Sequence, residues 1–279
     1  MPQEILVAFQ GEKGAYSEQA VRQFFGDAAA TLPCHSFADL LQVVQLGQAT
    51  HAMLPVENSL AGTVIPAYDQ LLDHDLRIQG EVLVKVEHCL LVLPGTTLEQ
   101  VKQARSHPQA LAQCEKTLAR LGIDPIPHYD TAGAARDLAR NPEPGSAAIA
   151  SALAAQTYGL TIVLRGIEDL PFNYTRFFAL GLTSPPRHDP SKTSIVFATR
   201  HVPGALHAVM GELADRGLNL TKIESRPRRN RPWHYLFFVD FEGHEDDPPV
   251  QEALLGILKR SSFLKVLGSY PAAILPTQG

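Results

Sequence analysis

The chain has 279 residues, with 29 acidic and 24 basic side chains and a formal net charge of −5 at pH 7. This mild acidic excess does not favour nucleic acid as a partner, and no uncharged apolar run is long enough to cross a membrane. A content of 45% hydrophobic and 19% charged residues is typical of a globular protein, and the length predicts two or three domains.

The first half of the chain alternates short apolar runs with segments of helical periodicity, which is the pattern of an α/β fold. Near the N-terminus, Ser17 stands in the position of a helix cap, and the helix is expected to reach about Phe25. The other expected elements of this part are strands at 4–9 and 51–56 and helices at 36–45 and 63–72. The N-terminal residues lack the basic region that begins a secretory signal, so we expect a cytoplasmic protein.

A second group of alternating elements follows residue 80, and together the two groups predict two α/β lobes. The expected elements are a strand region at 81–93, a helix at 97–104, a strand at 104–106, one helix from Ser106 to about Leu121, a strand at 128–129, a helix at 131–140, a strand at 147–150 and a helix at 151–158. We place the break between the lobes near 79–81 and the return near 166–169. The first lobe then covers about 1–80 and 166–183, and the second about 81–165.

A stretch rich in proline and serine at 184–192 is typical of a linker. Beyond it, residues 193–279 follow the order βαββαβ of a ferredoxin-like domain. The expected elements are strands at 193–198, 218–225, 233–241 and 263–268 and helices at 203–216 and 249–261. We therefore predict a two-lobed α/β region over 1–183 and a separate small domain after the linker.

Several common catalytic motifs are missing from the sequence. It has no G-x-x-x-x-G-K-[ST], no G-x-G-x-x-G after a strand, no G-x-S-x-G and no H-E-x-x-H spacing. The three cysteines show no C-x-x-C spacing, which argues against a disulfide framework or a structural zinc site. Nucleotide phosphate transfer, serine hydrolase chemistry and zinc catalysis therefore lose support.

The candidate chemistry lies in four polar clusters at the ends of predicted strands. The first, at 11–17, precedes a helix, where free N–H groups favour an anion, although an ordinary capped turn would look the same. The second places Glu57, Asn58 and Ser59 just before Gly62 and Thr63. Capping alone needs only one of these groups, so this cluster is a stronger candidate for a site.

The third and fourth clusters add a helix start and an aromatic stretch. Ser106, His107 and Gln109 precede Gln113 on one predicted helix, and a helix cap is the simplest explanation. In the segment 173–177, a threonine hydroxyl is followed by a guanidinium that is able to bind a carboxylate through two hydrogen bonds. Because neighbouring side chains on a strand point to opposite faces, only one of the two need face a site.

Taken together, these segments resemble the prephenate dehydratase family over nearly the whole chain. The matching stretches are Gly11-Glu12-Lys13-Gly14-Ala15-Tyr16-Ser17-Glu18, Pro55-Val56-Glu57-Asn58-Ser59 with Gly62, Ser106-His107-Pro108-Gln109 with Gln113-Cys114, Asn173-Tyr174-Thr175-Arg176-Phe177 and Glu224-Ser225-Arg226-Pro227. The resemblance implies two lobes similar to type II periplasmic binding proteins, followed by an ACT domain. It also implies decarboxylative dehydration of prephenate to phenylpyruvate, water and CO2, with feedback inhibition by L-phenylalanine at the ACT domain. Because this reaction makes the ring aromatic, which supplies its driving force, we expect it to need neither a metal nor a cofactor.

The resemblance carries roles onto individual residues of this chain. The catalytic positions it implies are Thr175, Glu57, Asn58 and Gln113, and the substrate-binding positions are Ser17, Ser59, Thr63, Ser106, Asn173, Arg176 and Phe177. The effector-binding positions are Gly204, Ala205, Leu206, Asn219, Leu220, Glu224, Ser225, Arg226 and Pro227. By the same resemblance, Thr175 donates a hydrogen bond to the departing hydroxyl. A threonine is a poor acid, so Glu57 or His107 is needed as the source of the proton.

Several alternatives accompany this interpretation. Arogenate dehydratase is the nearest one, because its substrate differs only in the side-chain amino group, and a non-catalytic amino-acid sensor would share the same folds. The basic residues Arg226, Arg228, Arg229 and Arg231 are interpreted as a solvated loop, because acidic residues at 242–247 offset them. Since ACT domains commonly pair, we expect a homodimer or homotetramer assembled through the ACT and catalytic domains.

Overall fold

The computed structural model describes residues 5–227 and 235–274, and these residues form two compact units. The first unit contains the chain up to Gln70 together with Val82–Phe177, and the second contains Leu71–Glu81 together with the chain from Phe178 onward. Of the basic residues in the predicted loop, Arg228, Arg229 and Arg231 lie outside the described residues. Among the described residues, no helix is both long and apolar enough to span a bilayer.

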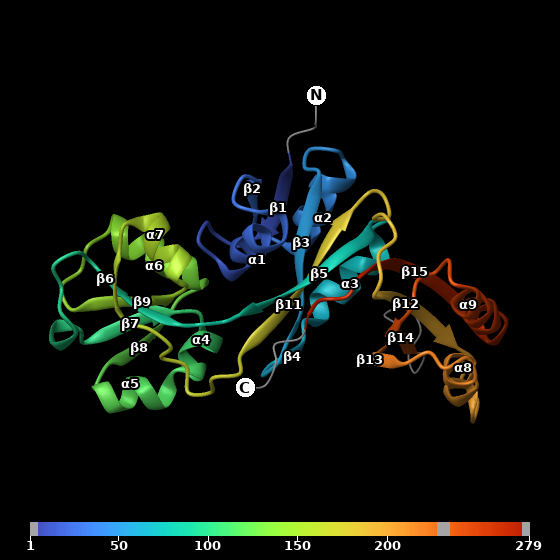
Figure 1. The fold of residues 1–279 in the computed structure, drawn as a ribbon. Coiled ribbons are helices and arrows are strands. Elements are labelled where there is room, and N and C mark those ends of the chain that lie inside the picture. Colours follow the sequence, from blue (N-terminus) through green and yellow to red (C-terminus); the bar gives the residue numbers. More distant parts are fainter. Residues whose placement is uncertain (1–4, 228–234, 275–279) are drawn as a thin grey trace. The chain divides into compact units, whose positions relative to one another are not determined.

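The first lobe is built on a sheet with the strand order β2-β1-β3-β11-β5 (Figure 1). Its strands are β1 (Leu6–Gln10), β2 (Ala30–Cys34), β3 (His51–Asn58), β5 (Arg77–Lys85) and β11 (Tyr174–Gly181), and β4 (Gly62–Thr63) pairs with the end of β3. Its helices are α1 (Tyr16–Phe25), α2 (Phe37–Gln45) and α3 (Ile65–Asp73). Because β1, β2 and β3 run parallel, each connection between them needs a crossover, which α1 and α2 supply.

The second lobe has a sheet with the order β10-β6-β9-β7-β8. Its strands are β6 (Cys89–Val92), β7 (Gln103–Ser106), β8 (Asp124–Pro127), β9 (Ser146–Ala150) and β10 (Thr161–Leu164), and its helices are α4 (Pro108–Gln113), α5 (Glu115–Leu121), α6 (Thr131–Arg140) and α7 (Ala152–Tyr158). Figure 1 shows α6 and α7 on one side of this sheet and α5 on the other. The strand β9 is buried over its whole length, as expected for a strand covered on both faces.

Both lobes have the same strand order when β4 is left out and the second sheet is read from β8 to β10. In each lobe the order is the second strand, the first, the third, the strand that comes from the other lobe, and the fourth. In the first lobe β11 is the strand that returns from the other lobe, and in the second lobe β6 has that position. The chain therefore passes between the lobes twice, once between β5 and β6 and once between β10 and β11. The predicted two-lobed α/β class is confirmed.

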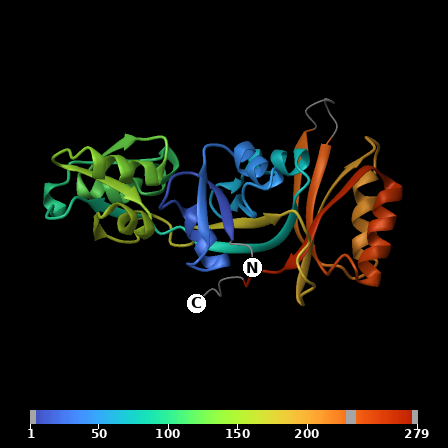
Figure 2. The same ribbon diagram turned by 90° about the horizontal axis from the view of Figure 1, so that it is seen from above.

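The C-terminal domain has the order βαββαβ that its sequence predicts. Its elements are β12 (Ser191–Thr199), α8 (Ala205–Ala214), β13 (Leu220–Pro227), β14 (Tyr235–Glu242), α9 (Pro248–Arg260) and β15 (Ser261–Pro271). The strands form the order β13-β14-β12-β15, and both helices cover the same face of this sheet (Figure 2). The core between them contains fully buried Ile195, Phe197, Val209, Val239 and Phe241.

Five predictions differ from the structure. The strand expected at 128–129 is β8, which lies earlier, at Asp124–Pro127. Ala15, not Ser17, is the N-cap of α1, and Ser17 is buried inside the first turn. The single helix expected over 106–121 is divided at Cys114, whose φ of −114° ends α4 before α5 begins. The helix expected at 97–104 is only the 3₁₀ turn η1 (Leu98–Gln100) followed by β7. Residues 79–81, where we expected a break, lie inside β5, because Gly80 keeps an extended conformation instead of forming a turn.

Candidate functional site

A cavity of about 440 Å³ lies within the first unit and is lined by residues from both lobes. This volume lies within the range of small-molecule sites, which is about 300–1,000 Å³. The polar residues of its lining are Tyr16, Asn58, Thr63, His88, His107, Gln109, Gln113, Thr131 and Thr175. The apolar part of the lining comes mainly from residues 61–66, between β3 and α3, and from Val86 and Ala110.

Thr175 lies at the start of β11, beside the end of β3. Its hydroxyl oxygen accepts a hydrogen bond of 3.0 Å from Nδ2 of Asn58. Among the described residues, no acceptor takes the proton of the Thr175 hydroxyl, so this O–H is available to a molecule in the cavity. The expected grouping of Thr175 with Asn58 and Gln113 is present, because all three line the same cavity.

The residues that follow Thr175 on β11 do not line this cavity. Arg176 is buried, and its guanidinium lies 3.8 Å from the carboxylate of Glu57. Phe177 is part of the apolar core. The sequence named both residues as substrate-binding, but strand alternation turns Arg176 away from the face of Thr175, and Phe177 fills the core beneath the sheet.

The polar cluster at the end of β3 divides between structural and cavity-lining residues. Oδ1 of Asn58 accepts from the backbone N–H groups of Leu60 and Ala61, which fixes the turn into β4. The hydroxyl of Ser59 donates to the carbonyl of Phe172 at 2.8 Å, so it ties this turn to the segment before β11. Thr63 lines the cavity, whereas Glu57 and Ser59 do not.

The second lobe contributes its side of the cavity from the start of α4. His107 is the N-cap of α4, and its ring Nδ1 accepts from the backbone N–H of Gln109 at 3.2 Å. Both residues line the cavity together with Gln113. Ser106 and Ser17, which the sequence also named as substrate-binding, are buried and do not line it. The hydroxyl of Ser106 donates to the carbonyl of Ile149 at 2.6 Å, which is a structural contact between β7 and β9.

Four polar lining residues, Tyr16, His88, Gln109 and Thr131, were not assigned a role from the sequence. Tyr16 was quoted within a motif, and His88 precedes an apolar strand, where a lone histidine reads as a core residue. Their rings meet edge to face with centroids 5.7 Å apart. Burial is the main cause that lowers the pKa of His88 and raises the pKa of Tyr16, so both groups are neutral near pH 7. The only sequence signal for a role of His88 was its polar ring directly before the apolar strand that begins at Cys89.

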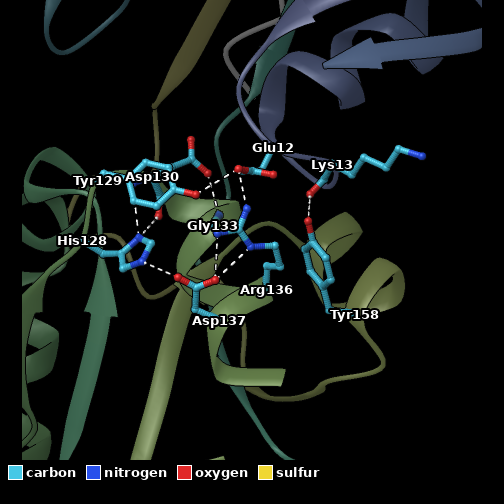
Figure 3. A network of polar contacts seen from close by, with 9 residues as sticks. All are labelled: Glu12, Lys13, His128, Tyr129, Asp130, Gly133, Arg136, Asp137 and Tyr158. Carbon is cyan, nitrogen blue, oxygen red and sulfur yellow. Dashed lines mark hydrogen bonds and ion pairs between the residues drawn. The ribbon is translucent and has the colours of Figure 1, made fainter. Parts of the chain in front are cut away.

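A network of polar contacts joins the two lobes beside the turn after β1 (Figure 3). Oε1 of Glu12 accepts from Nη1 of Arg136 at 2.5 Å and from the hydroxyl of Tyr129 at 2.9 Å. The Tyr158 hydroxyl donates to the carbonyl of Lys13 at 2.8 Å. These contacts give the motif at 11–18 a role in holding the lobes together.

The same turn touches the second lobe closely at Gly14. A Cβ atom at this position would lie 2.7 Å from Cα of Ala154, and φ of Gly14 is +85°. The hydroxyl of Ser151 donates to the Gly14 carbonyl at 2.6 Å. Only glycine combines this backbone conformation with so close an approach to α7.

The polar groups that line the cavity are hydroxyls, amides and two histidine rings. Among the described residues that line it, none is Asp, Glu, Lys or Arg. A bound anion would therefore be held by neutral donors such as amide, hydroxyl and imidazole groups. Such donors become stronger where a bound molecule displaces the water that competes with them.

A second hollow, of about 280 Å³, lies in the C-terminal domain at the start of α8. It is lined by Gly204, Ala205 and Leu206 together with His207 and residues of β12 and β14. The other residues named for effector binding are not part of its lining: Asn219, Leu220, Glu224, Ser225, Arg226 and Pro227 lie on or just before the edge strand β13. The structure thus brings together only the first of the two predicted effector segments.

Comparisons with known proteins agree with this architecture. A model of the prephenate dehydratase family matches residues 7–185, and a model of the ACT domain matches residues 193–258. Arogenate dehydratase 1 from Petunia hybrida is 46% identical over 97% of this chain and 68% of the relative. Arogenate dehydratase/prephenate dehydratase 6, chloroplastic, from Arabidopsis thaliana is 46% identical over 97% of this chain and 70% of the relative.

Two solved structures resemble the whole chain. Prephenate dehydratase from Arthrobacter aurescens in complex with L-Phe has a TM-score of 0.87 and 35% identity, covering 95% of this chain and 89% of that one. A structure described as GqqA, a novel type of quorum quenching acylases, has a TM-score of 0.89 and 39% identity, covering 96% of this chain and 98% of that one.

The expected cytoplasmic location is contradicted by the relatives. Several of those from Arabidopsis thaliana, at 42–46% identity, are named as chloroplastic. Targeting segments are separate from the folded domains that they accompany. The composition of the folded domains and their first apolar strand therefore carry no information about the cellular compartment.

The matched ranges cover both parts of the chain in the order that the two-lobed region and the βαββαβ domain have in the structure. They agree with the position of the cavity, which lies within the range of the first family model. The chain belongs to the prephenate dehydratase family of lyases and carries an ACT domain after its catalytic region.

Proposed function

We propose that this chain converts prephenate to phenylpyruvate, water and CO2, a step of phenylalanine biosynthesis. The observation that carries the proposal is the Thr175 hydroxyl, which lies in a neutral cavity of small-molecule size with its proton unengaged by any described residue. Asn58 and Gln113 line the same cavity and present amide groups to it.

The reaction aromatises the ring of the substrate, which supplies its driving force. The bond between the ring and its carboxylate breaks and leaves CO2, while the electron pair moves into the ring and expels the hydroxyl on the opposite carbon as hydroxide. One proton must reach that hydroxide to form water. The chain has to orient the dianion, stabilise the developing hydroxide and exclude competing water.

Thr175 stabilises the departing hydroxide as a hydrogen-bond donor and keeps its own proton. Because the Asn58 amide donates to the Thr175 oxygen, the O–H of Thr175 is polarised toward the cavity. Of the two proton sources that the sequence left open, His107 lines the cavity, whereas Glu57 does not and lies beside Arg176. We assign the proton delivery to His107 in its imidazolium form, in which Nδ1 carries a proton and gives up the hydrogen bond from Gln109; transfer of one proton to the hydroxide leaves the neutral ring, which takes a new proton from solvent.

The neutral lining favours prephenate over arogenate. Arogenate carries an ammonium group where prephenate has a keto group, and no carboxylate side chain lines the cavity among the described residues. A desolvated ammonium without a carboxylate partner is costly, so the keto substrate fits this lining better. The test is the ratio of kcat/KM for the two substrates with the purified chain. We expect at least about a tenfold preference for prephenate, corresponding to 1.4 kcal/mol, and a preference for arogenate would contradict the assignment.

An acylase reaction is not supported by the geometry around Thr175. Nucleophilic attack by a hydroxyl requires a base that accepts its proton. The described group in contact with the Thr175 oxygen is instead the amide donor of Asn58. The structural likeness to GqqA is therefore no support for Thr175 as a nucleophile in this chain.

The C-terminal domain is proposed to bind L-phenylalanine and to inhibit the enzyme. Support comes from the hollow beside Gly204 and Leu206 and from the Arthrobacter aurescens relative, which was solved with L-Phe. Inhibition requires that phenylalanine bind the active and inactive states with different affinities. Addition of phenylalanine should lower the rate, and an unchanged rate at saturation would contradict this regulation.

The domain boundaries and the assembly belong to the same proposal. We assign residues 1–183 to the catalytic region, 184–192 to a linker and 193–279 to the ACT domain. The matched ranges 7–185 and 193–258 support these limits. The strand β13 lies at the edge of its sheet, where a second sheet can be added, and this position supports a homodimer or homotetramer.

A further inference from the structure

Five polar side chains form one continuous hydrogen-bond chain at the cavity, namely Tyr16, His88, Gln113, Asn173 and Asn58. The hydroxyl of Tyr16 lies 3.0 Å from Nδ1 of His88, and Nε2 of His88 lies 2.8 Å from Oε1 of Gln113. Nδ2 of Asn173 donates to the same Oε1 at 3.0 Å, and Nδ2 of Asn58 donates to Oδ1 of Asn173 at 2.8 Å. This hydrogen-bond network connects the first lobe with α4 of the second.

The donor and the acceptor of each hydrogen bond between Asn58 and His88 follow from the backbone contacts of Asn58. Oδ1 of Asn58 accepts from the backbone N–H groups of Leu60 at 3.0 Å and Ala61 at 2.9 Å. A backbone N–H only donates, so the Asn58 amide has one possible orientation, with Nδ2 toward Asn173. Asn173 must then present Oδ1 to Asn58 and Nδ2 to Gln113. Gln113 must in turn present Oε1 as an acceptor.

This acceptor determines the tautomer of His88. The ring nitrogen that faces Oε1 of Gln113 has to carry a proton, so His88 is protonated on Nε2. Burial lowers the pKa of His88, which leaves the ring neutral and its Nδ1 unprotonated. Nδ1 is then an acceptor, and the Tyr16 hydroxyl is the donor beside it. The Glu87 carbonyl, 2.8 Å from the Tyr16 oxygen, shares that hydroxyl proton.

Two places in this hydrogen-bond network leave donors toward the cavity. Oε1 of Gln113, in the middle of the network, receives two hydrogen bonds, whereas no described residue accepts from its Nε2, so both N–H groups remain for a bound molecule. At the Asn58 end, Asn58 donates to the oxygen of Thr175 and leaves the Thr175 O–H unengaged. One fixed network thus sets the donor direction of two side chains that line the cavity.

We propose that His88, oriented by Tyr16, is a positioning residue for the dehydration reaction. Its Nε2–H holds the Gln113 carboxamide so that the N–H groups of Gln113, and not its oxygen, meet a carboxylate of the substrate. This role rests on the proposed function, whereas the bond directions do not. With the donor of His88 removed, Gln113 keeps only the bond from Asn173, and its amide gains the freedom to turn the oxygen toward the carboxylate.

The first test measures the tautomer directly and needs no substrate. Nitrogen-15 NMR of the wild-type chain with labelled histidine should show His88 protonated on Nε2 and unprotonated on Nδ1. The His88→Gln variant identifies the His88 signal by its disappearance. A ring protonated on Nδ1 would overturn the proposal, because Gln113 would then have to present its amide nitrogen to His88.

The second test separates positioning from a merely structural role. His88→Leu should lower kcat/KM about 10- to 100-fold, which is typical when a partner that orients a functional side chain is lost. His88→Gln, whose side-chain amide reproduces the Nε2–H donor, should recover most of this loss. In a Gln113→Ala background, His88→Leu should have little further effect, because the group it orients is gone.

The outcomes of the second test are distinct from those of the proposed function. Equal losses from His88→Leu in the wild-type and Gln113→Ala backgrounds would overturn the proposal, as would failure of His88→Gln to recover activity. If the wild-type chain converted neither prephenate nor arogenate, the proposed function would fail. The NMR measurement would then still decide whether His88 orients Gln113.

Discussion

Replacing Thr175 by valine isolates the hydroxyl that the mechanism requires. Valine has nearly the shape of threonine and the same preference for a strand, so β11 should keep its geometry. The Asn58 amide loses one acceptor but keeps Oδ1 of Asn173 at 2.8 Å and the carbonyl of Tyr174 at 3.2 Å. The variant should therefore fold normally and lack only the donor.

The size of the effect follows from what the hydroxyl does in the transition state. A single hydrogen-bond donor to developing negative charge is worth about 100- to 1,000-fold in kcat. Because the substrate hydroxyl is neutral before the bond breaks, the same donor contributes little to substrate binding. Thr175→Val should lower kcat by about this factor and change KM less than about threefold.

The assay follows phenylpyruvate formation from prephenate by absorbance, with kcat and KM measured separately. Thr175→Ser is the matched control, because it keeps a hydroxyl at the same position and should retain most of the activity. Thr175→Ala should behave like Thr175→Val. An unchanged kcat in Thr175→Val would refute the role of this hydroxyl, and a change confined to KM would assign it to substrate binding instead.

Three further predictions concern charge and burial. Glu81→Gln should destabilise the second unit by about 3 kcal/mol in denaturant unfolding, because the Glu81 side chain is 1% exposed and bonds Lys192 at 2.8 Å, and the variant leaves the Lys192 ammonium without a charged partner. Glu12→Gln should raise KM for prephenate about fivefold. The ion pair of Glu12 with Arg136 joins the lobes, and because it is partly exposed its loss should cost about 1 kcal/mol, which corresponds to this factor. Burial lowers the pKa of His88 from its ordinary value of 6.5, so the unfolded chain binds more protons below that pH. The free energy of unfolding should therefore fall as the pH drops below 6.5, and His88→Gln should weaken this dependence.

Each of these predictions has a control and a contrary outcome. Glu143→Gln breaks the exposed pair with Arg105 and should cost less than about 1 kcal/mol, so an equal loss in Glu81→Gln would contradict the argument from burial. An unaltered KM in Glu12→Gln would show that the lobes are held without this pair. Identical pH dependence in wild type and His88→Gln would mean that His88 titrates alike in the folded and unfolded chains.

The fold was largely predictable because its elements carry local signals. In the C-terminal domain, Leu206, Val209, Met210 and Leu213 recur with helical spacing, and the structure places α8 over them. Where local signals were missing, the prediction was wrong. Nothing in the residue types around Cys114 indicates a helix end, since the division between α4 and α5 depends on tertiary packing.

The site was predictable where polar residues cluster at strand ends. Asn58, Gln113 and Thr175 were named on that basis together with the family resemblance, and they line one cavity. Arg176 was named for its chemistry, but the face of a strand that meets the cavity is set by the neighbouring strands and is not visible in a pentapeptide. His88 was missed because its function depends on the partner Gln113, which lies 25 positions away in sequence and on the other side of a crossover.

The central claim is that this chain removes water and CO2 from prephenate in a single aromatising step. The most direct measurement incubates the purified chain with prephenate and quantifies phenylpyruvate and released CO2 together. The account predicts equal amounts of both products, formed much faster than in buffer alone. Product formation no faster than in buffer, or CO2 release without a matching amount of phenylpyruvate, would contradict it.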